Sequence, residues 1–366
     1  MKFEVQRETI LKPLQMVSGI VEKKQTQPIL SNILLDLQPN KLTLTATDLE
    51  MEVIASVAVD SNDKTSVTVP VRKFLDTCKT LNEGSNVKFS MAKEKAVLTS
   101  NKTRFSLTTL PAKDFPVIDS KSKLFNLLVP QATLKRLIEK TSFAMALQDV
   151  RYYLNGLLLE INTDSLKAVA TDGHRLAICS ALLDTGQSET KSVIIPRKAV
   201  LEISRILEDS DEEVEIIIGE NYIRLILGEV TFTSKLVDGQ YPNYDSVIPK
   251  NCDKQIVVDK YAIKQCLIRT SILSNEKYRG IKLEISEDSL KASANNPDQE
   301  EAEDEIPIEY DGNKIEMGFN VNYLIDAITA LDSENVELNI TDSNGSTLIK
   351  MPAEDSCLYV VMPMRL

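Results

Sequence analysis

The sequence repeats itself at a spacing of 124 residues. Segments 33–46, 157–170 and 281–294 align without a gap, since 157 − 33 = 124 and 281 − 157 = 124. Each segment contains two stretches of alternating apolar residues on either side of a polar turn, and the apolar positions coincide in all three copies. Alternation with a period of two, kept in phase three times, is typical of a strand hairpin with one buried face. We therefore expect a domain present in three tandem copies.

The length of the chain suits three domains. Its 366 residues give each copy roughly 120 residues, enough for a hydrophobic core of its own. We expect these domains at residues 1–122, 123–251 and 252–366. No stretch approaches the roughly 18 consecutive apolar residues of a membrane-spanning helix, and the charged amino end is not followed by the apolar core of a signal peptide. The sequence thus predicts a cytoplasmic protein.

Strands and two helices alternate in each copy. The second helix of a copy follows a strand, and Pro70 and Pro196 stand near its first turn, where proline is tolerated. Thr9 suits the N-cap of the first helix and Gly19 suits its end. Helices are expected at residues 9–19, 71–81, 131–141, 197–207, 260–270 and 321–331. The other segments alternate as strands do, so the predicted class is α+β with a two-helix, antiparallel-sheet domain in three copies.

Five cysteines are scattered through the chain: Cys78, Cys179, Cys252, Cys266 and Cys357. An odd number without a CxxC pair indicates neither a disulfide framework nor a zinc site. We expect these residues to be reduced and mostly packed.

Charge is unevenly distributed along the chain. A net charge of −12 argues against nucleic acid as a partner, because binding phosphates requires concentrated Lys and Arg. Basic residues nevertheless lie on or beside five of the six expected helices, whereas residues 298–311 hold eight Asp and Glu and no Lys or Arg. If the helices share one surface, an acidic protein has a basic face. The alternative to a basic face is that these Lys and Arg residues are simply solvated on exposed helices. The recurrence of basic residues in three copies disfavours this alternative.

Groups that could form an active site are scarce. The single histidine, His174, has Asp172 too close in sequence to orient it easily, and no serine lies in a GxSxG setting. A metal site would need further histidines or a cysteine cluster, and no Gly-rich phosphate loop is present. We expect a non-catalytic protein without cofactor or metal. The alternative function is that of a hydrolase that uses His174. The alternative role for His174 is a structural one, in which its ring is hydrogen-bonded to a backbone carbonyl.

The carboxyl end, YVVMPMRL, is apolar almost to the last residue. A chain end frays unless it docks on the rest of the protein. Met362 and Met364 have flexible side chains that suit a surface accepting several different partner side chains. The carboxyl end and the His174 loop are therefore candidates for a partner-binding surface.

Several longer motifs match one known family. They are YYLNG, TDGHRLA, FTSKLVDGQYPNY, ILSNEKYRG, ANNPDQEEAE, GFNV and YVVMPMRL. In this order and over its full length, the chain closely resembles the β subunits of bacterial DNA polymerase III, the sliding clamps. The resemblance implies a processivity factor for DNA replication, a head-to-tail homodimeric ring that encircles duplex DNA without sequence specificity.

The resemblance also implies a cleft between domains 2 and 3 that binds short peptide motifs. The partners expected through such motifs are the replicative DNA polymerase α-type subunit, the clamp loader, translesion polymerases, mismatch-repair proteins and ligase. The matching cleft positions are Leu154, Thr171, Gly173, His174, Arg175, Leu176, Pro242, Val247, Ser346, Val360, Met362, Pro363, Met364, Arg365 and Leu366. Ser246 replaces the arginine and Asn344 the apolar residue of the commonest family pattern, so a more polar rim is expected.

The resemblance further implies that the protein contacts DNA by electrostatic attraction to the phosphates, without base-specific hydrogen bonds. The matching positions are Lys24, Arg72, Gln148, Tyr152 and Tyr153. Lys24 stands where many members of the family have arginine, which keeps the charge but loses the fork geometry of the guanidinium.

The dimer interface implied by the resemblance pairs Phe105 and Leu107 of one chain with Ile272 and Leu273 of the other. Charged residues flank this contact: Lys73, Lys102 and Arg104 on one side, and Asp298, Glu301 and Asp304 on the other. A monomeric three-domain scaffold that binds peptides without encircling DNA is the competing hypothesis.

Overall fold

The computed structural model describes residues 1–22, 27–118, 123–250 and 252–365. The chain divides into two compact units, each of which consists of two separate stretches of the sequence. The first unit contains residues 1–132 and 201–236, and the second contains residues 133–200 and those from 237 onwards.

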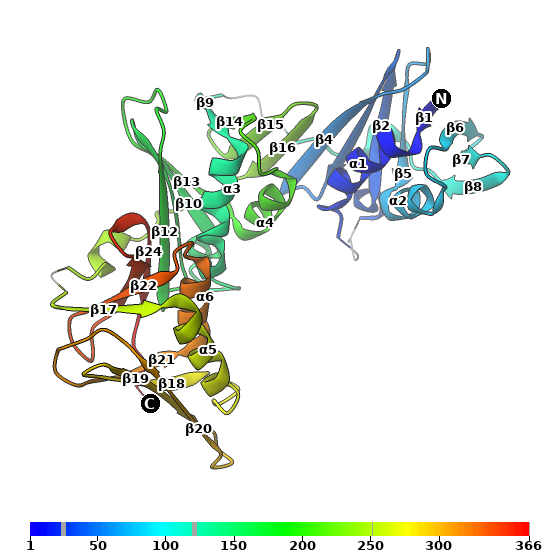
Figure 1. The fold of residues 1–366 in the computed structure, drawn as a ribbon. Coiled ribbons are helices and arrows are strands. Elements are labelled where there is room, and N and C mark those ends of the chain that lie inside the picture. Colours follow the sequence, from blue (N-terminus) through cyan, green and yellow to red (C-terminus); the bar gives the residue numbers. More distant parts are fainter. Residues whose placement is uncertain (23–26, 119–122, 251, 366) are drawn as a thin grey trace. The chain divides into compact units, whose positions relative to one another are not determined.

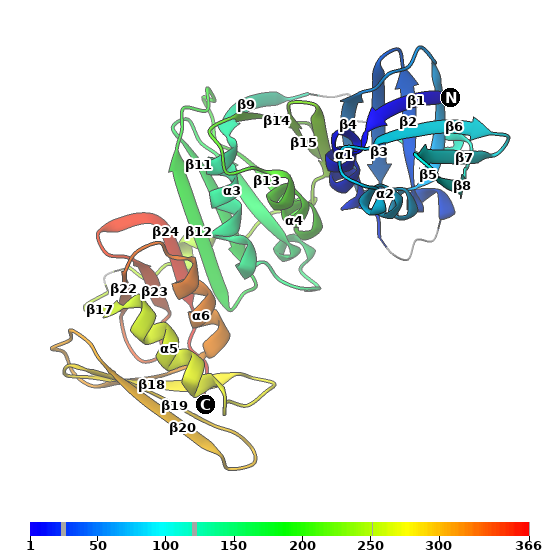
Figure 2. The same cartoon turned by 45° about the vertical axis from the view of Figure 1, so that its right-hand side comes forward.

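The helices agree with the predicted ones to within two residues at each end. They are α1 (Arg7–Ser18), α2 (Val71–Thr80), α3 (Gln131–Glu139), α4 (Arg197–Ile206), α5 (Lys260–Ser271) and α6 (Val321–Ala330). In the first unit α1 packs against β3 (Lys41–Thr47) and β4 (Met51–Ala58) and beside α2. In the second unit α5 packs against β19 (Ser289–Asn295) and β20 (Glu301–Pro307) and beside α6 (Figures 1 and 2).

Of two expectations about the first helix, one is wrong. Thr9 is not its N-cap, because the helix starts at Arg7, whose backbone N–H donates to the carbonyl oxygen of Ser85 at 2.9 Å. Gly19 ends the helix as expected, since it is the C-cap, with a right-handed φ of −61°. A Cβ at Gly19 would collide with the side chains of Glu202 and Arg205, so glycine permits this close approach.

The first unit contains one sheet of eight strands and one of four, with every pair antiparallel. The order of the larger sheet is β5 (Thr65–Pro70), β2 (Asn32–Gln38), β3, β4, β16 (Val230–Lys235), β15 (Tyr222–Leu227), β14 (Glu213–Ile218) and β9 (Phe125–Pro130). The order of the smaller sheet is β1 (Lys2–Gln6), β6 (Asn86–Ala92), β7 (Lys95–Ser100) and β8 (Thr103–Thr108).

The second unit repeats this plan. The order of its larger sheet is β13 (Lys191–Pro196), β10 (Gly156–Ile161), β11 (Ser165–Thr171), β12 (Arg175–Leu182), β24 (Glu354–Val361), β23 (Thr347–Met351), β22 (Asn335–Ile340) and β17 (Lys254–Asp259). The order of its smaller sheet is β20, β19, β18 (Gly280–Ser286) and β21 (Ile315–Asn320).

The repeated segments are hairpins, as predicted: β2–β3, β10–β11 and β18–β19. The equivalent residues Leu35, Leu159 and Leu283 are all buried on the inner face. The predicted α+β class with antiparallel sheets is confirmed.

Each eight-stranded sheet is formed where two four-stranded halves join edge to edge, and we call this junction a seam. The first seam pairs β4 with β16, and the second pairs β12 with β24. Val53 lies opposite Phe232 in the first seam, and Ala177 lies opposite Tyr359 in the second. Since 177 − 53 = 124 and 359 − 232 = 127, the two seams have the same register in equivalent strands.

The expectation of reduced thiols is wrong for one pair of cysteines. Cys179 and Cys357 are opposite each other across the second seam and form a disulfide. They are 178 residues apart in the sequence, so their spacing gave no sign of the pair. Cys78, Cys252 and Cys266 are free.

Candidate functional site

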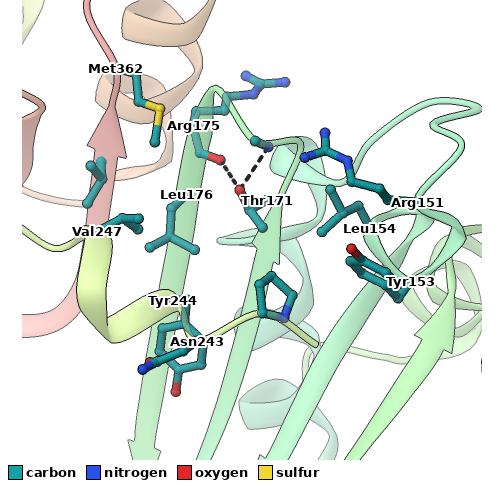
Figure 3. Close-up of a pocket in the computed structure, with 13 residues that line it drawn as sticks. Arg151, Tyr153, Leu154, Thr171, Arg175, Leu176, Asn243, Tyr244, Val247 and Met362 are labelled. Atoms are coloured by element: carbon teal, nitrogen blue, oxygen red, sulfur yellow. Dashed lines mark hydrogen bonds between the residues drawn. The ribbon is translucent and has the colours of Figure 1, made fainter. Parts of the chain in front are cut away.

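A cavity of about 230 Å³ lies in the second unit beside the second seam. It lies where β11 turns into β12, next to the end of β24, and the short helices at Tyr152–Asn155 and Tyr244–Val247 contribute to it (Figure 3). Its lining consists of Arg151, Tyr153, Leu154, Thr171, Gly173, Arg175, Leu176, Pro242, Asn243, Tyr244, Val247, Val360 and Met362. A small, mostly apolar hollow with a few polar groups is typical of a ligand site.

The turn between β11 and β12 is fixed by its own side chains. The Thr171 hydroxyl donates to the carbonyl oxygen of Arg175 at 2.6 Å and accepts the Gly173 N–H at 3.1 Å (Figure 3). A carboxylate oxygen of Asp172 accepts the backbone N–H groups of His174 and Arg175, at 2.9 and 3.0 Å. The turn is therefore a preformed wall of the cavity.

Two features of the structure explain why position 173 is a glycine. Its φ of +87° lies in the left-handed region, which side chains other than glycine rarely adopt. A Cβ there would also lie 3.0 Å from a guanidinium nitrogen of Arg151. The Arg151 side chain thus passes directly over the turn at the mouth of the cavity.

Arg151 is held in place by Asp149. The carboxylate accepts Nε and Nη2 of Arg151 at 3.0 and 2.9 Å. The hydrogen bonds from Arg151 lower the pKa of Asp149 to about 2. The guanidinium remains about half exposed, so it is a cation that a ligand at the mouth can reach.

The floor of the cavity is apolar. Leu154, Leu176 and Val360 are buried, with exposed fractions of 2%, 3% and 1%. Tyr244 borders this floor, and its hydroxyl donates to Glu160. Burial and then Glu160 raise the pKa of the Tyr244 hydroxyl, so it stays a neutral donor. Aliphatic side chains of a ligand would gain by entering this floor.

The guanidinium of Arg175 points away from the floor (Figure 3). Its Nε donates to Asp172 at 3.1 Å, Nη1 to Asp326 of α6 at 2.5 Å and Nη2 to the carbonyl oxygen of Phe143 at 2.6 Å. The rings of Phe143 and Tyr323 face it, with centroids 5.4 and 4.5 Å away. Arg175 therefore links the turn to α6.

The carboxyl end docks on the second unit. The Met362 N–H donates to the carbonyl oxygen of His174 at 3.0 Å, and the Met364 N–H donates to that of Gly318 in β21 at 2.8 Å. His174 itself is exposed, and its ring stacks on Tyr323 with a centroid distance of 6.5 Å.

The structure gathers most of the expected cleft residues around this cavity. Those in its lining are Leu154, Thr171, Gly173, Arg175, Leu176, Pro242, Val247, Val360 and Met362. Ser346 instead lines a neighbouring hollow of about 370 Å³, together with Ser246 and Val247. His174, Pro363, Met364 and Arg365 are outside both linings, and Leu366 is outside the described residues.

Four lining residues were missing from the expected cleft: Arg151, Tyr153, Asn243 and Tyr244. Tyr153, Asn243 and Tyr244 lie within the motifs YYLNG and FTSKLVDGQYPNY, and Arg151 directly precedes the first motif. Adjacency to these motifs was thus the signal that could have identified them.

The expected DNA-contacting residues are distributed over both units. Gln148, Tyr152 and Tyr153 belong to the second unit, and the two tyrosine rings make an edge contact with their centroids 6.0 Å apart. Tyr152 is 58% exposed, whereas Tyr153 also lines the cavity. Arg72 lies on α2 in the first unit and donates to the carbonyl oxygen of Val21 at 2.9 Å. Lys24 is outside the described residues.

The expected dimer residues lie at one edge of each smaller sheet or next to it. In the first unit, Arg104, Phe105 and Leu107 are on β8, Lys102 precedes β8, and Lys73 is on α2. In the second unit, Glu301 and Asp304 are on β20, Asp298 precedes β20, and Ile272 and Leu273 follow α5.

Two of these residues already have contacts within their own unit. Leu107 is only 7% exposed, whereas Ile272 is 72% exposed. The carboxylate of Asp304 accepts Nε and Nη2 of Arg269 at 2.8 and 2.5 Å. Ile272 is therefore accessible at this edge, whereas Leu107 is largely covered within its own unit.

Searches for other kinds of site were limited to the described residues. Among them, no three His, Cys, Asp or Glu side chains are grouped so that they could hold a metal ion. No helix in the same part of the chain is long and apolar enough to cross a membrane.

Comparison with known proteins places the chain in one family over its whole length. Residues 1–119, 128–243 and 245–365 match the N-terminal, central and C-terminal domains of the DNA polymerase III beta subunit. The beta sliding clamps of Escherichia coli K12 and Pseudomonas putida are 50% and 48% identical to the chain, with both proteins covered completely in each comparison.

A solved structure gives the same result for the fold. The DNA polymerase III subunit beta sliding clamp of Pseudomonas aeruginosa, in a crystal structure bound to griselimycin, matches with a TM-score of 0.97 and 48% identity, and each chain is covered completely. The chain therefore belongs to the family of DNA polymerase III beta subunits, the sliding clamps, and is a non-catalytic processivity subunit built from three tandem clamp domains.

Proposed function

We propose that two copies of the chain join head to tail into a ring that encircles duplex DNA, and that the cavity beside the second seam binds short peptides of replication and repair proteins. The observation that carries the ring is the repeated register of the two seams. It leaves two strands, β8 and β20, in the positions that a third seam would use.

β8 and β20 are the end strands of the two smaller sheets. A shift of 124 residues maps β4 onto β12, and a second shift of 124 maps β12 onto β20. A shift of 127 residues back along the chain maps β24 onto β16, and a second one maps β16 onto β8. An end strand presents unpaired N–H and C=O groups that can pair with another chain. A second copy therefore supplies the missing partner for each edge.

The repeat also gives the register of this third seam. Since 177 + 124 = 301 and 232 − 127 = 105, Phe105 of one copy is expected opposite Glu301 of the other. Lys102 then lies opposite Asp304, and Arg104 lies next to the acidic residues of β20. Opposite charges across a strand pair favour this alignment over a shifted one.

Apolar contact would add to the third seam. Ile272 is 72% exposed and Leu273 is partly exposed at the end of α5, and both would be covered by the partner copy. Burial of such side chains is a main source of interface stability.

DNA binding is proposed to rest on Lys24, Arg72, Gln148, Tyr152 and Tyr153. Cations attract phosphates without reading bases, and such contacts let a protein slide along DNA. The exposure of Tyr152 and Gln148 supports this role. The acidic remainder of the protein would repel DNA from other surfaces.

The cavity is proposed to take a peptide with aliphatic anchors. Each anchor buried on the apolar floor would contribute about 1.5–3 kcal/mol. The partners expected are the replicative polymerase α-type subunit, the clamp loader, translesion polymerases, mismatch-repair proteins and ligase, which would compete for one site. Because the relative from Pseudomonas aeruginosa is a sliding clamp bound to griselimycin, we expect griselimycin to bind here as well.

The domain boundaries at residues 1–122, 123–251 and 252–366 remain part of this proposal, as does a cytoplasmic location, where the chromosome is replicated. The experiment that tests the ring compares retention of the loaded protein on circular and linear duplex DNA. A ring stays on circular DNA and slides off free ends, whereas equal retention on both would contradict encirclement. Light scattering tests the monomeric scaffold, which predicts the mass of a single chain.

A further inference from the structure

The side chain of Arg175 is largely engaged within its own chain. Its three nitrogen positions donate to Asp172, Asp326 and the Phe143 carbonyl oxygen, and two aromatic rings cover its faces. Only 13% of the side chain is exposed. Three of the five N–H groups of this guanidinium are therefore engaged, and a ligand could reach the other two only through the small exposed part of the side chain.

The first seam contains the same turn without this arginine. Its residues 47–51 are equivalent to 171–175, since 171 − 47 = 124. The Thr47 hydroxyl donates to the carbonyl oxygen of Met51 at 2.7 Å and accepts the Leu49 N–H at 3.1 Å. Asp48 accepts the N–H groups of Glu50 and Met51 at 2.9 and 2.7 Å. The turn therefore forms without Arg175.

The carboxylate on the facing helix also differs between the seams. Glu202 of α4 occupies the position equivalent to Asp326, the sixth residue of each helix. Glu202 binds Arg205 of its own helix. Asp326 instead binds Arg175 of the turn. In the second seam the ion pair between Arg175 and Asp326 thus couples the turn to its facing helix, and there the turn forms a wall of the cavity described above.

We propose that Arg175 is a positioning residue: it does not bind the peptide but, through Asp326, holds the turn at residues 171–175 in place against α6, so that affinity at the cavity is set from α6. This inference rests on the proposed peptide-binding function of the cavity. The mechanical link is short, because the Met362 N–H is bonded to the carbonyl oxygen of His174 in the same turn. Displacing the turn would move Leu176 and Met362 together.

The test removes the link at its far end. Asp326 is not in the lining of the cavity, so Asp326→Asn changes no ligand contact. Asp332→Asn is the matched control, because Asp332 follows the same helix and pairs with Lys140 away from the cavity. Asp326→Glu restores the carboxylate, and Arg175→Lys keeps the charge without the fork. The probe is griselimycin, measured by calorimetry on the full-length chain.

We expect Asp326→Asn and Arg175→Lys each to weaken griselimycin binding about tenfold. Asp332→Asn leaves the affinity unchanged, and Asp326→Glu restores most of it. The double variant with Arg175→Lys and Asp326→Asn is no weaker than the weaker single variant, because both substitutions break one link. Hydrogen exchange at residues 173–175 of the ligand-free protein speeds up in Asp326→Asn and not in Asp332→Asn.

Two results would overturn the inference. Unchanged affinity in a folded Asp326→Asn variant would show that α6 does not set the site, and additive losses in the double variant would show that Arg175 meets the ligand itself. If the parent protein does not bind griselimycin, that part of the proposed function fails. The hydrogen-exchange comparison then still decides whether Asp326 positions the turn.

Discussion

The two seams of the molecule share a backbone plan and differ in a few side chains. Both join equivalent strands in the same register, and both contain a Thr-Asp turn with the same four hydrogen bonds. At the first seam the turn ends in Met51, which is buried, and the next residue is Glu52. At the second seam these positions are Arg175 and Leu176, and a cavity opens beside them.

The difference indicates how a repeated fold acquires a site at one copy only. The hydrogen bonds that shape the turn depend on Thr and Asp, which both copies have. The apolar floor and the link to the facing helix depend on residues that only the second copy has. Structure and site are therefore separable here, and substitutions at equivalent positions can test them separately.

The largest expected effect concerns a third seam between two chains. Ile272→Ala combined with Leu273→Ala removes apolar surface that we expect the partner to cover, and this should weaken dimerisation by about 2–4 kcal/mol. Light scattering at micromolar concentration is expected to give the mass of a folded monomer. Leu182→Ala is the control, because Leu182 is 92% exposed and lies outside the expected interface. A dimer mass for the double variant would contradict the third seam.

The turns themselves provide a matched pair. Thr171→Val and Thr47→Val each remove one hydroxyl with two hydrogen bonds, so each should lower the free energy of unfolding by about 1–2 kcal/mol. Only Thr171→Val should also weaken griselimycin binding, by about fivefold or more. Calorimetry and chemical unfolding measure the two effects. Equal binding by both variants would mean that the turn does not shape the cavity.

The central position of the turn gives a smaller effect. Gly173→Ala forces a side chain into the left-handed region and against Arg151, at a cost of about 1 kcal/mol. Leu49→Ala is the control, since Leu49 already has a φ of +78° with a side chain. We expect reduced stability and reduced griselimycin binding for Gly173→Ala, and unchanged binding for Leu49→Ala. The same measurements decide between these outcomes.

The smallest effect is a pH dependence of the first unit. Burial raises the pKa of Glu52, whose carboxylate accepts the Ile118 N–H at 3.3 Å. A carboxyl group with a raised pKa in the folded state contributes stability below its unfolded pKa, and this contribution is lost as the pH rises through the folded pKa. Glu52→Gln should therefore raise the Tm at pH 7.5 by about 1–3 °C and lose this advantage near pH 4.

Glu50→Gln serves as the control for this measurement, because Glu50 is exposed and its substitution should give no such pH dependence. A Tm difference between Glu52→Gln and the parent that stays constant with pH would show that the carboxyl group does not titrate as its burial requires.

Secondary structure was predictable because it depends on short-range patterns. The hairpins repeat in phase, and the second helix of each copy follows a strand at a fixed spacing, so all six helices were located to within two residues. The error at Thr9 arose where a distant segment determines the start of the helix. Ser85 receives the N–H that starts α1, and Arg205 explains the glycine at position 19.

The seams could not be predicted from the sequence, because they join strands that are far apart in the chain. Cys179 and Cys357 show the difficulty: their spacing gave no reason to pair them, and only the register of β12 with β24 brings them together. The link from Arg175 to Asp326 spans 151 residues and has the same origin. The expected cleft residues came from resemblance to a family, since no local pattern marks a cavity whose walls come from separate segments.

The unlike edges β8 and β20 would have a genetic consequence. A chain with a disrupted β20 would still have an intact β8. It could therefore pair with β20 of a normal copy at one junction of the ring, while the other junction failed to form. In a cell that makes both versions, the defective copy would divert normal copies into rings that do not hold closed. Substitutions at such an edge would then be dominant, whereas loss of the gene product from one of two gene copies would not.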